Sequence, residues 1–296
     1  MKKYFLTECV TKDDVIHQGV YFEPKEKSDT AILYIHGLSS MFSSHIASCN
    51  AFSDMGEKMH IGFASFNNRG FGLISGPQKK DATALTGITH IRGGAGQEVF
   101  EESVLDIDAG ITFLTQRGYA RVVLVGRSTG ANKTCFYAGT VDDPRVIGVV
   151  LNSAISDRLE KTKEEIAATL PLMKQRIAEG KEDDLLTGYS FFPMTPKRYV
   201  SLYEQGSNED VFDYGDERPK MTIYSKIKKP LFVIFGERDE HAERPIADIV
   251  HVFDTHTTSL RYKSVIVPNA LHGFDGMEQE LATLICEWID CRVSLC

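Results

Sequence analysis

Short apolar runs alternate with stretches of helical periodicity along most of the chain. The apolar runs are too short for helices and are typical of strands buried on both faces of a sheet. Strands are predicted at residues 31–35, 61–66, 122–125, 146–151, 231–235 and 264–267. Helices are predicted at residues 44–55, where Gly56 is expected to end the helix, and at residues 98–115, 131–137, 246–253 and 276–291. Such alternation indicates βαβ units, and therefore an α/β fold with a mostly parallel central sheet and helices on both faces.

Two segments of the first half depart from this alternation. Residues 3–9 and 15–22, on either side of Thr11-Lys12-Asp13-Asp14, have the pattern of a β-hairpin. Residues 73–97 contain several glycines and no clear periodicity. Because a loop this long inside a compact domain is usually functional or mobile, we expect it to help shape a site.

The largest change in pattern begins at residue 155 and ends at residue 228. This segment is highly charged and contains no long apolar run, while residues 157–179 have helical spacing. We therefore predict an α/β core made of residues 1–154 and 229–296, with residues 155–228 inserted as a mainly helical cap over the sheet.

Composition narrows the classes of function. The chain has 296 residues with 33 Lys and Arg against 41 Asp and Glu, a net charge of −8. An acidic chain without basic clusters argues against nucleic acid or an anionic membrane surface as a partner. Neither a signal peptide nor an apolar run long enough to span a membrane is visible, so we expect a cytoplasmic protein. The six cysteines form no C-x-x-C pair, which favours free thiols and argues against a zinc site.

A candidate nucleophile follows the apolar run 122–125. The run passes without a spacer into Gly126-Arg127-Ser128-Thr129-Gly130 and then into a predicted helix. Glycines are needed on so tight a strand-to-helix turn because side chains do not fit where strand and helix nearly touch. With 24 glycines in the chain, the pattern alone arises by chance in roughly one of ten such sequences. Its context makes Ser128 our candidate nucleophile.

A serine hydroxyl needs a base within hydrogen-bond reach, and the base needs an orienting carboxylate. His272 follows the predicted strand 264–267, and Asp239 follows the predicted strand 231–235. The carboxyl ends of parallel strands line one crevice, so Ser128, Asp239 and His272 should lie on the same rim. Glu237 and Glu240 compete with Asp239, which its spacing from the strand favours. His251 and His256 belong to a helix and its following turn and are interpreted as structural.

Attack on a carbonyl also requires hydrogen-bond donors for the developing oxyanion. One should be the backbone N–H of Thr129, directly after the nucleophile. The other should come from the loop after strand 31–35, and its position there selects the backbone N–H of Leu38. The alternative is that His36-Gly37 only terminates the strand.

Five motifs occur in an order that resembles the α/β-hydrolase superfamily. They are His36-Gly37, Asn68-Arg69-Gly70-Phe71-Gly72, Gly126-Arg127-Ser128-Thr129-Gly130, Gly236-Glu237-Arg238-Asp239 and Leu271-His272-Gly273-Phe274. The resemblance implies the α/β-hydrolase fold with a Ser-Asp-His site. It leaves the substrate open, because the superfamily includes esterases, thioesterases, lipases, peptidases, acyltransferases and non-catalytic members.

Two further details refine the resemblance. Gly93-Gly94-Ala95 and Ser128-Thr129-Gly130-Ala131-Asn132-Lys133 are similar to a branch of serine hydrolases that includes siderophore-esterase-like proteins. Arg127 is a departure, because many relatives carry histidine there. It either places a cation near the site or points away and pairs on the surface.

The sequence therefore predicts a serine hydrolase that cleaves a small-molecule carboxylic ester through an acyl-enzyme, with no cofactor and no metal. The same machinery also suits an amidase or peptidase, a thioesterase or an acyltransferase, and a protein of this fold can instead bind a ligand with little turnover. Phe191, Phe192, Tyr199 and Tyr203 are candidates for lining the substrate pocket, although packing within the cap is the favoured interpretation. The acyl-chain length and the oligomeric state are left open.

Overall fold

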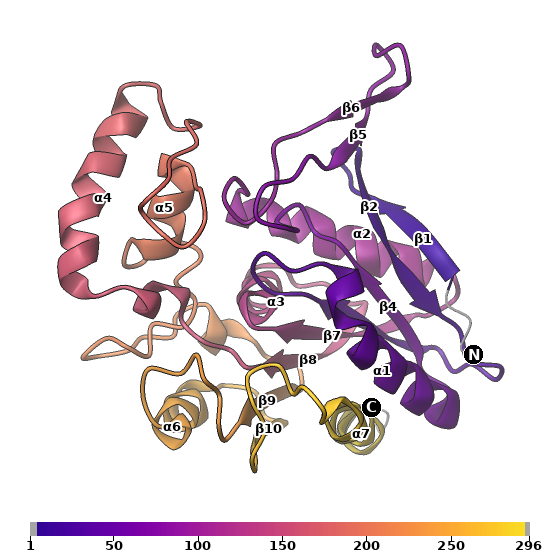
Figure 1. Cartoon of the computed structure of the whole chain (residues 1–296). Coiled ribbons are helices and arrows are strands. Elements are labelled where there is room, and N and C mark those ends of the chain that lie inside the picture. Colours follow the sequence, from indigo (N-terminus) through magenta and orange to yellow (C-terminus); the bar gives the residue numbers. More distant parts are fainter. Residues whose placement is uncertain (1–4, 294–296) are drawn as a thin grey trace.

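The computed structural model describes residues 5–293, which form a twisted sheet with helices on both faces (Figure 1). The strands of this part are β1 (Phe5–Val10), β2 (Val15–Phe22), β3 (Thr30–Ile35), β4 (Gly62–Phe66), β5 (Gln78–Lys80), β6 (Ile88–His90), β7 (Arg121–Arg127), β8 (Val146–Asn152), β9 (Leu231–Gly236) and β10 (Tyr262–Val267). Their order is β10-β9-β8-β7-β3-β4-β2-β5-β6, with β1 paired to β2. The six strands from β10 to β4 pair in parallel, and the pairings of β1, β2, β5 and β6 are antiparallel. The predicted mostly parallel sheet is confirmed.

The helices cover the sheet from two sides. They are α1 (Ile46–Met59), α2 (Ser103–Thr115), α3 (Thr129–Thr140), α4 (Lys163–Ala178), α5 (Pro196–Tyr203), α6 (Ile246–His256) and α7 (Glu278–Trp288). Alternate residues of each strand point to opposite faces, so Leu33 of β3 packs in one core with α2, α3 and α6. Tyr34, its neighbour, packs in the other core with α1 and α7. This double coverage explains why the central strands are continuous apolar runs.

The N-terminal hairpin forms as predicted over the described residues; residues 3 and 4 of the prediction lie outside them. Two other local predictions need correction. Helix α1 does not end at Gly56 but continues to Met59, and His60 caps it with a left-handed backbone, φ 62°. Gly56 is needed inside the helix because a Cβ there would lie 2.4 Å from the backbone oxygen of Ile61. Residues 73–97 are also not wholly irregular, since β5 and β6 form a short hairpin within them.

Residues 155–228 contain helices α4 and α5, which lie side by side and apart from the sheet in Figure 1. Short 3-10 turns, η3 (Asp157–Glu160) and η4 (Tyr224–Lys226), lie near the ends of this segment. Helix α4 begins with a capping box between Thr162 and Glu165. Helix α5 begins with Pro196 after the N-cap Thr195. The two helices enclose a small core of their own, which includes Met173, Phe192, Met194, Tyr199, Leu202 and Tyr203.

Within residues 5–293, no helix has both the length and the apolar character needed to cross a membrane. The five described cysteines are free thiols, and all of them except Cys291 are buried. Cys135, on α3 behind Ser128, lies in the core and is fully buried, and burial raises the pKa of its thiol far above the usual value.

Candidate functional site

The central feature of the site is the turn between β7 and α3, with Ser128 at its apex. Ser128 has φ 56° and ψ −132°, a conformation that L-residues rarely adopt and that costs about 1–3 kcal/mol. The flanking glycines permit it: a Cβ on Gly126 would lie 2.3 Å from the oxygen of Gly130, and one on Gly130 would lie 2.3 Å from the oxygen of Ile35. The turn therefore presents the hydroxyl of Ser128 above the carboxyl ends of the strands.

His272 lies in the loop after β10 and is held by three contacts. Its Nδ1 is 2.9 Å from each carboxylate oxygen of Asp239. Its backbone N–H donates to Glu240 at 3.0 Å, and its backbone oxygen accepts from the Ser153 hydroxyl at 2.9 Å. Because Nδ1–H donates to Asp239, the Nε2 lone pair is available to act as a base. Ser153, at the end of β8, was not found by sequence reasoning.

The contacts of the three candidate acids show which of them can orient the imidazole of His272. The Asp239 carboxylate is completely buried against the imidazole and also accepts the backbone N–H of His241 at 3.0 Å. Glu237 accepts the backbone N–H of Asn269 at 2.9 Å instead. Glu240 likewise contacts the backbone of the histidine loop. All three acids thus act on that loop, but only Asp239 reaches the ring of His272.

Ser128 and His272 line one cavity of about 540 Å³, together with Leu38 and Thr129. This volume is typical of small-molecule sites. The N–H of Thr129 belongs to the first turn of α3, where helix N–H groups have no partner within the helix. The loop carrying Leu38 approaches closely, because a Cβ on Gly37 would lie 2.9 Å from the Cβ of Ser128. The structure therefore brings together all five residues that the sequence assigned to the reaction.

The four aromatic candidates of the cap divide into two pairs. Phe191 and Tyr203 line the cavity, and Phe191 is 68% exposed. Phe192 and Tyr199 are buried in the small core between α4 and α5 and do not line the cavity. The Tyr203 hydroxyl donates to Glu160, another residue of the cavity wall.

The wall formed by the cap carries acidic residues that sequence reasoning missed. Asp157 lines the cavity and accepts hydrogen bonds from the Thr129 hydroxyl at 3.2 Å and the Asn132 amide at 3.3 Å. Burial, and then the nearby charge of Glu209, raise the pKa of Asp157 to about 7. Its carboxyl group consequently changes charge near neutral pH, directly beside Thr129. Its position shortly after the end of β8 was the available signal.

The opposite wall carries a cation. Arg127 lines the cavity, and its Nη1 lies 2.8 Å from Nδ1 of His45. His45 Nε2 lies in turn 2.6 Å from the hydroxyl of Ser40. Burial, and then the charge of Arg127, lower the pKa of His45 to about 4. Of the two alternatives for Arg127, the structure places its side chain at the site.

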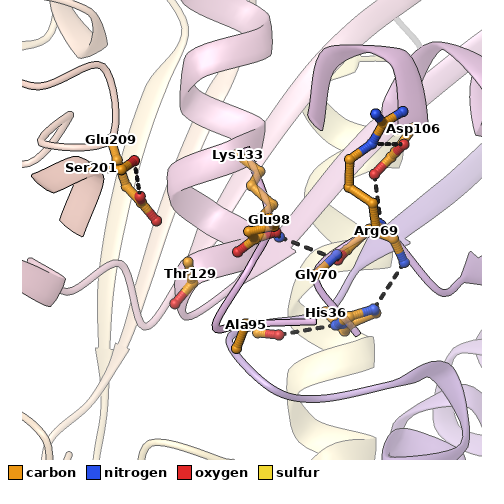
Figure 2. A network of polar contacts seen from close by, with 12 residues as sticks. His36, Arg69, Gly70, Ala95, Glu98, Asp106, Thr129, Lys133, Ser201 and Glu209 are labelled. Atoms are coloured by element: carbon orange, nitrogen blue, oxygen red, sulfur yellow. Dashed lines mark hydrogen bonds and ion pairs between the residues drawn. The ribbon is translucent and has the colours of Figure 1, made fainter. Parts of the chain in front are cut away.

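A buried network of charges joins residues 155–228 to the helix that follows Ser128. Figure 2 shows four of its residues, Glu98, Lys133, Ser201 and Glu209. Lys133 of α3 is 1% exposed and pairs with Glu98 at 2.6 Å. Arg198 of α5 is fully buried and contacts the other oxygen of Glu98 at 2.9 Å. Arg198 also pairs with Glu209 and donates to the backbone oxygen of Ala95 at 2.8 Å. Glu209 in turn accepts a hydrogen bond from the Ser201 hydroxyl at 2.7 Å. Helix α5 is therefore fastened to the core by ion pairs without access to solvent.

A second network holds the loop that carries Leu38 (Figure 2). Arg69 binds the buried carboxylate of Asp106 through both its side chain and its backbone N–H, each at 2.9 Å. The next residue back, Asn68, donates its backbone N–H to Nε2 of His36 at 3.2 Å. Burial, and then the charge of Lys133, lower the pKa of His36 to about 3. A neutral His36 whose Nδ1 lies 3.0 Å from the Gly37 oxygen thus supports the loop beside Ser128.

A larger groove of about 1060 Å³ lies between α4 and the segment after α5, and neither Ser128 nor His272 lines it. We therefore place the site in the smaller cavity, where the chemically competent groups converge. Among residues 5–293, no group of three or more His, Cys, Asp and Glu side chains is arranged to hold a metal ion.

Comparisons with known proteins agree with this architecture. Residues 88–293 match the model of the family described as "Protein of unknown function (DUF1749)". Solved structures with the same fold include an esterase of Pyrococcus furiosus, with 18% identity and a TM-score of 0.62 over 98% of this chain and 92% of that one. Est1E of Butyrivibrio proteoclasticus, solved with ferulic acid bound, has 14% identity and a TM-score of 0.64 over 99% and 100%.

The α/β hydrolase GrgF of Penicillium sp. sh18 has 12% identity and a TM-score of 0.70, over 99% of this chain and 100% of that one. No curated protein matches the chain by sequence. At such low identities the likeness concerns the fold alone, and it is the α/β-hydrolase fold that the motifs implied.

Proposed function

The chain belongs to the family whose model matches residues 88–293 and has the α/β-hydrolase fold, and from this premise we propose that it is a serine hydrolase that cleaves carboxylic esters. The observation that carries the proposal is the convergence of Ser128, on its strained turn, and the His272–Asp239 pair on one cavity. That esterases are among the proteins of similar fold supports the choice of ester.

In the proposed mechanism, Nε2 of His272 takes the proton of the Ser128 hydroxyl as its oxygen attacks the acyl carbon. The backbone N–H groups of Leu38 and Thr129 stabilise the oxyanion of the tetrahedral intermediate. Protonated His272 then gives its proton to the departing alcohol, which leaves Ser128 acylated. A water molecule, deprotonated by His272, releases the acid and restores the serine. Asp239 holds the imidazole in the required tautomer and stabilises its charged form.

The cap, residues 155–228, would cover this reaction and shape the substrate pocket. Phe191 and Tyr203 line the cavity and are the cap aromatics that we expect to contact substrate. Amides, thioesters and acyl transfer use the same groups and remain alternatives within the same mechanism. A small-molecule ester is the simplest substrate, because the cavity is of small-molecule size.

The first prediction is that Ser128→Ala abolishes hydrolysis of p-nitrophenyl acetate and p-nitrophenyl butyrate. We expect kcat/KM to fall by about 10³-fold or more, since removal of a nucleophile leaves only binding and oxyanion stabilisation. A fluorophosphonate probe should label the wild-type protein, with the adduct located at Ser128 by mass spectrometry. Equal rates for the two proteins would refute the assignment of Ser128.

The same experiments separate an enzyme from a ligand-binding protein. A protein that uses this fold only to bind would show neither turnover nor fluorophosphonate labelling, although the cavity could still take up a ligand. Labelling at Ser128 without turnover of either ester would indicate a competent nucleophile whose substrate is not a simple ester. Amide and thioester substrates of the same acyl chain would then be compared.

A further inference from the structure

Arg127 differs in what it contacts from the four arginines that make several ion pairs. Each of those four pairs with two or more carboxylates: Arg69 with Asp13, Glu102 and Asp106, Arg145 with Asp108 and Asp143, Arg158 with Asp210 and Asp216, and Arg198 with Glu98 and Glu209. Arg127 makes no ion pair with any carboxylate among residues 5–293 of the structure. Its hydrogen-bond partner is the imidazole of His45, at 2.8 Å.

This contact brings no negative charge to Arg127. The guanidinium is always protonated and only donates, so Nδ1 of His45 must be the acceptor and the ring must be neutral. The low pKa of His45 agrees with that state. The proton of His45 is then on Nε2 and is directed to the oxygen of Ser40, 2.6 Å away. Ser40, which also lines the cavity, keeps its own hydroxyl proton for another acceptor.

The surroundings of Arg127 indicate where a negative group would be bound. One acid lies close to Arg127 without forming an ion pair with it. The Oδ2 of Asp275 and the Nη2 of Arg127 lie 2.1 and 2.9 Å from the point where a Gly273 side chain would begin, so the two atoms are at most about 5 Å apart, and Asp275 does not line the cavity. The other acids of the cavity, Asp157, Glu160 and Glu243, come from the cap and from the loop after β9. Arg127, Ser40, Ser44 and His45 belong to the wall formed by the core.

From this polarity we infer that the substrate carries a carboxylate, or another anionic group, that is bound by Arg127 and the Ser40 hydroxyl on the core wall of the cavity. The inference deepens the proposed function and rests on it. A planar guanidinium that lines a cavity and forms no direct ion pair is well suited to bind a carboxylate. Because the chain as a whole carries a net charge of −8, attraction of an anion must come from such a local group and not from the overall field.

The second prediction compares matched esters that differ in a terminal carboxylate. The acyl-side pair is 4-nitrophenyl hydrogen adipate and 4-nitrophenyl hexanoate, and the alcohol-side pair is 3-carboxyphenyl butyrate and phenyl butyrate. Wild-type protein should prefer the anionic member of at least one pair, after subtraction of spontaneous hydrolysis. Arg127→Gln should reduce that preference, as the ratio of kcat/KM values, by about 10- to 100-fold, mainly through KM. Arg127→Lys should retain part of it.

Two controls distinguish a structural effect of Arg127→Gln from the loss of recognition of the carboxylate. Arg92→Gln removes an arginine whose side chain is 64% exposed and which lies far from the cavity lining, so it should leave both ratios unchanged. The preference should also weaken as salt is raised, because the guanidinium is only partly buried. If wild-type protein prefers neither anionic ester, or if Arg127→Gln slows both members of each pair equally, the inference is wrong.

A binding measurement tests the inference without turnover. Adipate is titrated calorimetrically into Ser128→Ala and into the double variant Ser128→Ala/Arg127→Gln. We expect the double variant to bind adipate at least about tenfold more weakly, from the lost charge-assisted hydrogen bonds. Equal affinities would overturn the role of Arg127 even if esters are hydrolysed. Loss of ester hydrolysis with the affinity difference intact would instead refute the proposed reaction and keep the anion site.

Discussion

The buried network between α5 and α3 leads to a third prediction, on the replacement of Arg198 by methionine. Its core holds two cations, Lys133 and Arg198, and two carboxylates, Glu98 and Glu209, all almost inaccessible to solvent. Methionine has a similar length but neither charge nor donors, so Arg198→Met leaves one excess negative charge in the interior. Breaking a buried pair in this way costs about 3–5 kcal/mol. In a chain of this size each kcal/mol lowers Tm by about 2 °C, so Tm should fall by about 6–10 °C.

The pH dependence of this deficit distinguishes a lost charge from a lost shape. Glu98, Glu209 and the nearby Asp157 all face the position of Arg198. Without the guanidinium, the interior carries an excess of negative charge, and this excess falls at low pH, where protons are more available. The difference in Tm between wild type and variant should therefore be smaller at pH 5 than at pH 8, measured by circular dichroism at constant ionic strength.

Arg92→Met is the matched control, because its ion pair with Asp183 is exposed on both sides and should contribute less than about 1 kcal/mol. Two results would refute the reasoning. One is a fall in Tm of less than about 2 °C for Arg198→Met, which would mean that the network contributes little. The other is a deficit that is the same at pH 5 and pH 8, which would point to lost packing and not to uncompensated carboxylates.

Two further predictions replace an aspartate of the site by asparagine. Asp239→Asn should lower kcat for p-nitrophenyl butyrate by about 10³- to 10⁴-fold, because an amide cannot hold His272 in the tautomer that frees Nε2; a variant that keeps a tenth of the wild-type rate would contradict this role. Asp157 has a pKa raised to about 7 in the fold, so the wild-type protein loses stability as pH rises from about 4 through 7. The Tm of Asp157→Asn relative to wild type should therefore increase from pH 5 to pH 8, and a pH-independent difference would show that Asp157 does not titrate there.

The order of strands and helices could be predicted from the sequence, because it depends on patterns among neighbouring residues. A buried parallel strand requires a continuous apolar run, and a helix covering it requires apolar residues at helical spacing, so the alternation can be read from neighbouring residues. The errors occurred where a distant contact decides. Gly56 looked like a helix stop, but the backbone of Ile61, beyond the end of α1, is what requires glycine there. Residues 73–97 likewise contain the hairpin of β5 and β6, whose sequence has no alternation of apolar and polar residues from which it could be predicted.

The residues of the candidate site also include some that could be predicted from the sequence and some that could not. Ser128, Asp239 and His272 could be named because each follows a predicted strand end, and the topology of a parallel sheet places strand ends together. Ser153 also follows a strand end, but a lone serine has no distinguishing pattern. Asp157 also follows a strand end, but its place in the cavity wall depends on how residues 155–228 are placed against the core, which no local pattern shows.

Arg127 shows why the chemistry of a site cannot be deduced from its motif alone. Its place in the turn was clear from the sequence, and both of its possible fates were consistent with the pattern. What decides between them is His45, which lies 82 residues away and contacts the guanidinium through a neutral imidazole. A carboxylate in place of that imidazole would make Arg127 a structural residue like Arg198. Because the contact between Arg127 and His45 carries no negative charge, Arg127 is a candidate for selecting an anionic substrate.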